Sequence, residues 1–187
     1  MVVTNTGSLT LEAFLALPET KPASEYINGQ IIQRPMPKTR HSRLQSKLTE
    51  MINGVAEADQ LAYAFPELRC TFGGRSIIPD IAIFLWQNIA FDADGEPLDD
   101  IVVPPDWVIE ILSPDQSANR VTGNILHCIK HGCQMGWLLD PGDRSIMILQ
   151  PQQPPELVSG DELVPVIATL PLQLTATQIF GWLKMTQ

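Results

Sequence analysis

Two short apolar runs, residues 79–85 and 106–114, constrain the fold of this 187-residue chain more than any other feature. Both are rich in β-branched residues, so both predict buried β-strands. Each run also has a carboxylate set among its apolar residues, Asp80 in the first and Glu110 in the second, which itself begins with Asp106. Because an ionised acid in a buried strand costs free energy unless it is paired or binds a metal, each of these acids needs a partner.

The rest of the chain alternates helix and strand patterns. We expect helices at 10–17, 39–55, 117–131 and 175–183. Asn28-Gly29 predicts a first hairpin, and Gly73-Gly74 predicts a second one that joins residues 68–72 to a strand at 76–85. Residues 86–100 read as an acidic loop, and further strands are expected at 107–112, 136–140, 145–149, 156–158 and 163–167.

The helix at 117–131 has two patterned faces. Apolar residues at helical spacing are expected to point inward: Val121, Ile125, Leu126 and Ile129. A polar stripe is expected on the solvent side: Arg120, Asn124, His127 and His131.

This order of elements predicts an α+β or mixed α/β core, with one sheet and helices against it. A chain of this length, with 44% hydrophobic and 18% charged residues, suits one domain over residues 1–187. No apolar run approaches the roughly 20 residues that span a bilayer, and the first residues lack a signal core, so we expect a cytoplasmic protein without a membrane segment. The three cysteines, Cys70, Cys128 and Cys133, have no Cys-x-x-Cys spacing and are expected to be free thiols.

Charge is segregated along the chain. The net charge of −9 disfavours nucleic-acid binding, yet residues 26–49 contain no acid and five of the twelve bases. These are Arg34, Lys38, Arg40, Arg43 and Lys47. Residues 92–115 contain eight acids and no base. The helix at 39–55 therefore has a basic stripe, which is either a nucleic-acid surface or a solvated helix face.

Side chains alternate along a strand, so Glu110 shares a face with Val108 and Leu112. If the strands that contain Asp80 and Glu110 are neighbours, the two carboxylates approach each other and repel. A divalent cation such as Mg²⁺ or Mn²⁺ relieves that repulsion, because both ions prefer oxygen ligands. The alternative is that each acid is a salt-bridge partner or a strand-end residue that faces water.

Five short motifs follow one another along the chain. They are Glu25-x-x-x-Gly29, Pro35-Met-Pro-Lys-x-x-His41, Pro79-Asp80-Ile-Ala-Ile, Pro104-Pro-x-Trp-Val-Ile-Glu110-Ile-Leu-Ser-Pro114 and Gly136-Trp-Leu-Leu-Asp-Pro141. In this order they are similar to the Uma2 family of restriction-endonuclease-like proteins, within the PD-(D/E)xK nuclease superfamily.

The resemblance implies a restriction-endonuclease-like fold, with a mixed central β-sheet flanked by helices and preceded by an N-terminal helix and hairpin. It implies that Asp80 and Glu110 bind a catalytic Mg²⁺ and that DNA is the substrate. We also expect a homodimer, because strand candidates that look exposed and segments that contain Trp leave room for one, and nuclease folds often use two copies to address both strands. Glu25 and His41 match family positions too. Glu25 would reach the metal through water, and His41 would contact phosphate or orient a carboxylate. A hairpin ion pair and a helix-start hydrogen bond are the alternatives for these two.

The chain lacks the lysine that the resemblance leads us to expect. The superfamily's usual lysine position is Leu112 here, and the family's alternative position on the following helix falls at Gly123-Asn124. Arg120 or His127 is the candidate replacement. The sequence thus predicts a metal-dependent endonuclease in which Lys38, Arg40, Arg43 and Lys47 contact DNA. The alternative is an inactive protein on a nuclease scaffold that binds nucleic acid or a partner through those bases.

Overall fold

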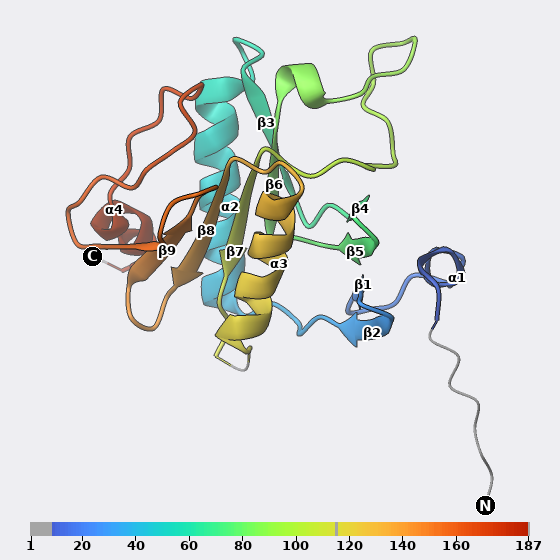
Figure 1. Cartoon of the computed structure of the whole chain (residues 1–187). Coiled ribbons are helices and arrows are strands. Elements are labelled where there is room, and N and C mark those ends of the chain that lie inside the picture. Colours follow the sequence, from blue (N-terminus) through green and yellow to red (C-terminus); the bar gives the residue numbers. More distant parts are fainter. Residues whose placement is uncertain (1–8, 115, 187) are drawn as a thin grey trace, which may run out of the picture.

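Two β-sheets organise the molecule (Figure 1), whose computed structural model describes residues 9–114 and 116–186. The first eight residues, for which no signal segment is predicted, and Asp115, the last acid of the acidic stretch, lie outside the described residues. The elements in chain order are α1 (Leu11–Leu15), β1 (Ser24–Ile27), β2 (Gln30–Gln33), α2 (Thr39–Ala56), β3 (Ala62–Pro66), β4 (Cys70–Phe72), β5 (Arg75–Ile77), β6 (Ile81–Leu85), a 3-10 turn (Trp86–Asn88), β7 (Trp107–Ile111), α3 (Ala118–Lys130), β8 (Met135–Asp140), β9 (Ser145–Leu149), β10 (Glu156–Ser159) and α4 (Ala176–Gly181).

The larger sheet has six strands in the order β10-β9-β8-β7-β6-β3. It is mixed, because β7 and β8 are parallel while its other neighbouring strands are antiparallel. The smaller sheet has four strands in the order β2-β1-β5-β4. The mixed central sheet flanked by helices confirms the predicted fold class.

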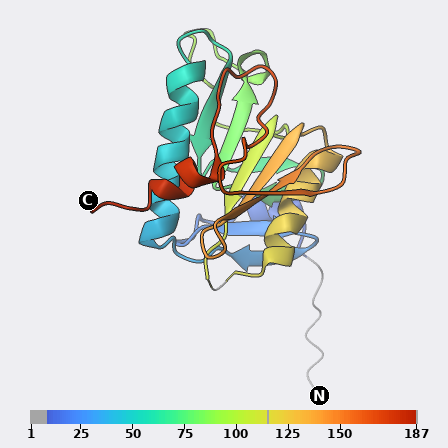
Figure 2. The ribbon, with the colours of Figure 1, turned by 90° about the vertical axis from the view of Figure 1, so that its left-hand side faces the viewer.

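Helices cover both faces of the larger sheet (Figure 2). The core on one face joins α2 and α4 to the sheet, and the core on the other face joins α3 and the smaller sheet to it. Gly136 on β8 allows α3 to pack closely, because a Cβ at that position would lie 2.0 Å from Ile125 Cγ2. Strand β7 serves both cores: Trp107 and Ile109 face the first, whereas Val108 faces the second, as the predicted alternation requires.

Local sequence signals explain most element ends. Asn28 and Gly29 both have positive φ, 52° and 84°, in the hairpin between β1 and β2. Thr10 caps α1 by accepting a hydrogen bond from Ala13 N, and Thr175 begins α4 with a capping box. All three cysteines are buried free thiols, as predicted.

The predicted strand at 76–85 is wrong as a single element. Residues Arg75–Ile77 pair with β1 and β4, whereas Ile81–Leu85 pair with β3 and β7 in the other sheet. Pro79 lies between them and has no N–H to continue a ladder. Asp80 therefore lies where the chain crosses from one sheet to the other, at the entrance to β6.

Three further expectations are wrong. Residues 163–167 form no strand beyond a single bridge from Leu163 to Thr175, because Pro165 interrupts the run. Leu126 points outward and is 50% exposed. Asn124 and His127 do not face solvent, since both are buried and His127 stacks on Phe72 of the smaller sheet. That sheet covers α3 on a side that a local pattern assigns to water.

Within the described part of the chain, no helix is long and apolar enough to cross a membrane.

Candidate active site

Asp80 and Glu110 lie on neighbouring strands. Strands β6 and β7 are antiparallel, with Ile81 opposite Ile109 and Ala82 opposite Val108. Extending this register by one residue places Asp80 opposite Glu110. Directly opposite side chains in antiparallel strands have Cβ atoms about 4.5–5.5 Å apart, which is close enough for both carboxylates to contact one ion.

The Asp80 carboxylate is buried, at 1% exposure, and is held by three groups. Its Oδ2 accepts a hydrogen bond from Ile111 N at 2.7 Å. Its Oδ1 contacts the Arg34 guanidinium and lies 3.1 Å from His41 Nε2. Burial alone would raise the pKa of Asp80, but His41, Arg34 and the Ile111 N–H together lower it, so this acid is ionised at neutral pH.

Glu110 has the opposite electrostatic character. It is 4% exposed, and none of the ion pairs among the described residues includes it. Burial, and then the charge of Asp80, raise the pKa of Glu110 well above its ordinary range, against the opposing effects of Arg34 and the Asp80 backbone N–H. The raised pKa of Glu110 favours its protonated form, and a cation bound next to the two acids can replace that proton.

Arg34 is the positive charge of this site, and the sequence did not identify it. It follows β2, and the charges of Asp80, Glu110 and Glu25 raise the pKa of its guanidinium despite its burial. The first hairpin contains a sequence signal that could have identified Arg34 as a neighbour of Glu25. Its two-residue turn pairs Glu25 with Ile32, so Arg34, two residues after Ile32, is diagonal to Glu25 on the same face.

Glu25 is joined to the site from β1. Its Oε1 accepts a hydrogen bond from Ile78 N at 2.9 Å, and its Oε2 accepts one from Asn124 Nδ2 at 3.4 Å. Burial raises the pKa of Glu25, while the Ile78 N–H, Arg34 and Asn124 oppose that shift. Asn124 of α3, where the resemblance implies a lysine, therefore points into the carboxylate cluster but brings no charge.

His41 connects α2 to the site. Besides the Nε2 contact with Asp80, its Nδ1 lies 3.3 Å from Ser113 Oγ. The Nε2 contact has an ion-pair distance but falls outside hydrogen-bond geometry. Gln45, one turn further along α2, donates from Nε2 to the Asp80 carbonyl at 2.7 Å. Helix α2 thus positions Asp80 by contacting both the carboxylate and the backbone carbonyl of this residue.

The four other predicted bases have different surroundings. Lys38 and Arg40 line a cavity that also includes His41. Arg43 Nε donates to the Trp182 carbonyl, and Lys47 pairs with Glu50 at 2.7 Å on the surface. Only the beginning of the basic stripe therefore lies at the site.

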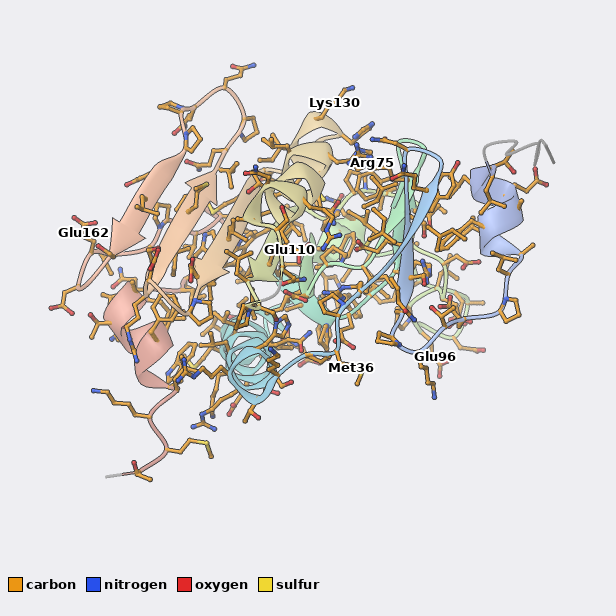
Figure 3. All side chains as sticks on the ribbon, turned by 90° about the horizontal axis from the view of Figure 1, so that it is seen from below. Met36, Arg75, Glu96, Glu110, Lys130 and Glu162 are labelled. Carbon is orange, nitrogen blue, oxygen red and sulfur yellow. The ribbon has the colours of Figure 1, made fainter. Side chains whose placement is uncertain are left out.

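The two candidate replacements for the missing lysine also differ. Arg120 lines the same depression as Glu25, Glu110 and Asn124. His127 lies elsewhere, with Nε2 3.1 Å from the Phe72 carbonyl, and burial lowers its pKa to about 4. Figure 3 views the molecule from below and labels Glu110 near its centre, between α2 and α3.

The arrangement combines three buried carboxylates with one guanidinium, beside openings to solvent at Arg34 and Arg120. An acid with a depressed pKa and an acid with a raised pKa can together bind a divalent metal. The guanidinium, which is held in place beside them, can stabilise charge on a phosphate group.

Comparison with known proteins identifies the family of this chain. The model of the Uma2 family, described as "Putative restriction endonuclease", matches residues 11–178. The chain is 51% identical to a crystal structure described as a putative nuclease belonging to DUF820 from Anabaena variabilis ATCC 29413, with a TM-score of 0.92. That match covers 94% of this chain and 99% of the other. No curated protein matches.

A second structure, a cryoEM complex of DrdV with DNA, has a TM-score of 0.31 and 10% identity over 77% of this chain and 13% of that one, too low a likeness to support an argument. The family match spans most of the chain and includes Glu25, His41, Asp80 and Glu110. The chain therefore belongs to the Uma2 family of restriction-endonuclease-like proteins.

Proposed function

We propose that this protein is an endonuclease that hydrolyses DNA phosphodiester bonds with a Mg²⁺ or Mn²⁺ ion held by Asp80 and Glu110. The observation that carries the proposal is the β6–β7 register, whose extension by one residue beyond Ile81 and Ile109 brings the two buried carboxylates opposite each other. Family membership supports a nuclease-like function, and the carboxylate pair supports the metal.

The donor set fits such an ion. Mg²⁺ usually takes one or two carboxylates from a protein and completes its shell with water and phosphate oxygens. Among the described residues, no cluster of three or more His, Cys, Asp and Glu side chains is arranged as a ligand cage. Glu110 is buried and forms none of the ion pairs found among the described residues, so a bound cation would offset the cost of its charge. When bound, the ion would polarise the scissile phosphate and lower the pKa of an attacking water.

The chain's own residues would then have separate tasks. Arg34 would move from Asp80 towards the phosphate and stabilise the negative charge that develops there, which a guanidinium can do although it cannot act as a base at neutral pH. His41 would hold the Asp80 carboxylate in position. Glu25, next to Arg34 and Asn124, would accept a hydrogen bond from water near the metal.

Nicking of a supercoiled plasmid tests the proposal, with Mg²⁺, Mn²⁺ or EDTA. Asp80→Asn and Glu110→Gln are each expected to lower the rate about a thousandfold, which corresponds to several kcal/mol of transition-state stabilisation. Lys130→Ala, at an exposed position in the last turn of α3, is the control and is expected to cleave as wild type does. Equal metal-dependent rates for wild type and both carboxylate variants would overturn the proposal.

A second function is favoured by one specific observation. Arg34 already pairs with Asp80, and Asn124 adds no charge, so the site is partly neutralised without metal. A catalytically inactive protein that binds nucleic acid or a partner would keep this arrangement. It is expected to show salt-sensitive DNA binding, weakened by Arg40→Ala, with no cleavage in either metal.

The homodimer also stays a proposal, in which two copies would present two carboxylate pairs to the two strands of a duplex. Sedimentation velocity over a range of protein concentrations measures it directly, and a monomer at every concentration would contradict it.

A further inference from the structure

Arg120, in the first turn of α3, lies beside the carboxylate cluster and has no task in the proposed function. Its side chain is exposed, and it lines the same depression as Glu110 and Asn124. His127, which belongs to the same predicted polar stripe, is buried instead and stacks on Phe72. Arg120 therefore presents a guanidinium to solvent at the rim of the site.

The depression has two walls that come from distant parts of the chain. One wall is the end of the first hairpin, residues 32–35, which includes Arg34. The other wall is the beginning of α3, which includes Arg120. Glu25 and Glu110 also line the depression, and both are buried, so they form its floor. Each wall therefore contributes one guanidinium, and the floor contributes two acids.

The volume of the depression limits what can enter it. It is about 20 Å³, which is enough for one water molecule or a small cation and too little for a phosphate group. A DNA strand that is cleaved at this site must therefore lie across the rim, where Arg120 is exposed. Only water or a small cation can reach the acids on the floor.

A phosphate at this rim needs positive charge close to it, because the acids on the floor repel it. The guanidinium of Arg120 can provide that charge through two parallel hydrogen bonds to phosphate oxygens. None of the ion pairs found among the described residues includes Arg120. Unlike Arg34, which contacts Asp80, it does not have to leave a carboxylate in order to bind phosphate.

We propose that Arg120 binds a phosphate of the cleaved strand at the rim of the depression, next to the scissile phosphate. The proposal rests on the proposed function, because the depression leads to Glu110. Arg120 is a substrate-binding residue in this arrangement, whereas the buried Arg34 stabilises the charge that develops during the reaction. The strand therefore crosses the molecule between the first hairpin and α3.

DNA binding measured without metal tests this contact apart from catalysis. The probe is a short fluorescein-labelled duplex, and fluorescence anisotropy is recorded in EDTA over a range of salt concentrations. Arg120→Gln removes one phosphate contact, so the magnitude of the salt slope of log K is expected to fall by about 0.9. Arg120→Lys keeps the positive charge and is expected to keep a slope close to that of wild type.

Lys130→Gln is the matched control, because it removes the same charge from an exposed position on the same helix. Lys130 lies about 15 Å along α3 from Arg120, and Figure 3 labels it well apart from Glu110. The control is expected to bind DNA with the wild-type slope. A wild-type slope for Arg120→Gln, or an equal fall for Lys130→Gln, would overturn the proposal.

The kinetics of plasmid nicking give the second measurement. A contact with a flanking phosphate is equally strong in the ground state and in the transition state. Arg120→Gln is therefore expected to raise KM about threefold to tenfold and to leave kcat within about twofold of wild type. A fall in kcat with an unchanged KM would overturn the proposal, because it would place Arg120 in the chemical step.

Failure of the proposed function gives a different pattern of results. In that case no metal would support cleavage by wild type, while Arg120→Gln would still lower the salt slope of DNA binding. Metal-dependent cleavage by wild type, together with a wild-type slope for Arg120→Gln, would instead overturn the phosphate contact and leave the proposed function standing.

Discussion

The two faces of the six-stranded sheet bury different kinds of side chain. On the face covered by α2 and α4, β7 contributes Trp107 and Ile109 to an apolar core. On the face covered by α3, the same strand contributes Val108 to a second core and then Glu110 beside Asp80. Strand β7 therefore contributes only apolar side chains to one face and a costly acid, Glu110, to the other.

This difference shows what each face contributes. Burial of apolar side chains stabilises the first face, so its substitutions should act on stability. On the second face Glu110, whose pKa is raised, is expensive to ionise, so its neutral replacement should stabilise the metal-free protein while it removes the proposed activity. Four predictions test this contrast.

The largest effect is expected on the apolar face. Trp107→Ala removes a fully buried ring that packs edge to face with Trp137, at a centroid distance of 4.7 Å. The free energy of unfolding, measured in urea, should fall by about 3–5 kcal/mol. Trp107→Phe keeps most of the ring volume and should cost less than about 1.5 kcal/mol. Equal costs for the two variants would contradict this account of the face.

The second-largest effect is expected for Arg34, the positive charge beside the acids on the other face. Arg34→Met leaves Asp80 without its guanidinium, so the free energy of unfolding in EDTA should fall by about 2–4 kcal/mol. Arg40→Met, at an exposed position, is the control and should change stability by less than about 0.5 kcal/mol. Mn²⁺ should restore more stability to Arg34→Met than to wild type, because the vacated Asp80 Oδ1 can bind the ion. Equal stability of the two variants would contradict a charge role for Arg34.

A smaller, pH-dependent gain is expected for Glu110→Gln. Because the folded-state pKa of Glu110 is raised, wild type loses stability as pH rises from the unfolded value near 4.5 towards the folded pKa, and the glutamine does not. In EDTA at neutral pH the variant should be more stable by about 1–3 kcal/mol. The depressed pKa of Asp80 acts oppositely, since its stabilisation is lost as pH falls below about 3.8. A pH-independent difference between variant and wild type would contradict the raised pKa.

The smallest effect concerns the uncharged position on α3. Asn124→Lys would place a second cation beside Glu25, where it could stabilise charge on the phosphate, and should raise the rate of plasmid nicking about threefold to tenfold. Asn124→Met, similar in length but neutral, should not raise the rate. An unchanged rate for the lysine variant would show that Arg34 already provides the charge.

Local patterns predicted the elements that carry the site. The Asn28-Gly29 hairpin, the two long helices and the alternation in β7 are confirmed, because turn chemistry and side-chain periodicity act over a few residues. The strand β3 (Ala62–Pro66) was missed, and residues 76–85 were joined into one strand. Both depend on pairing partners that are remote in the sequence, which periodicity does not encode.

The residues of the candidate site likewise fall into two groups, those that local sequence patterns predicted and those that depend on tertiary contacts. Asp80 and Glu110 were conspicuous because an acid in an apolar run is anomalous wherever the strand lies. Arg34 was not conspicuous, since a base after a polar strand is ordinary in sequence. It became a site residue only because β1 and β2 place it against the start of β6, and its charge then acts on Asp80, Glu110 and Glu25.

By itself, the sequence determined the class of fold, the pair of acids and the absence of a lysine at Leu112 and Gly123-Asn124, because each is written in residue type and spacing. Only the tertiary structure decided that Asp80 lies opposite Glu110 and that a guanidinium from the first hairpin lies beside them. Those relations join segments up to 76 residues apart, from Arg34 to Glu110. Their positions follow from strand register and sheet packing, which no local pattern specifies.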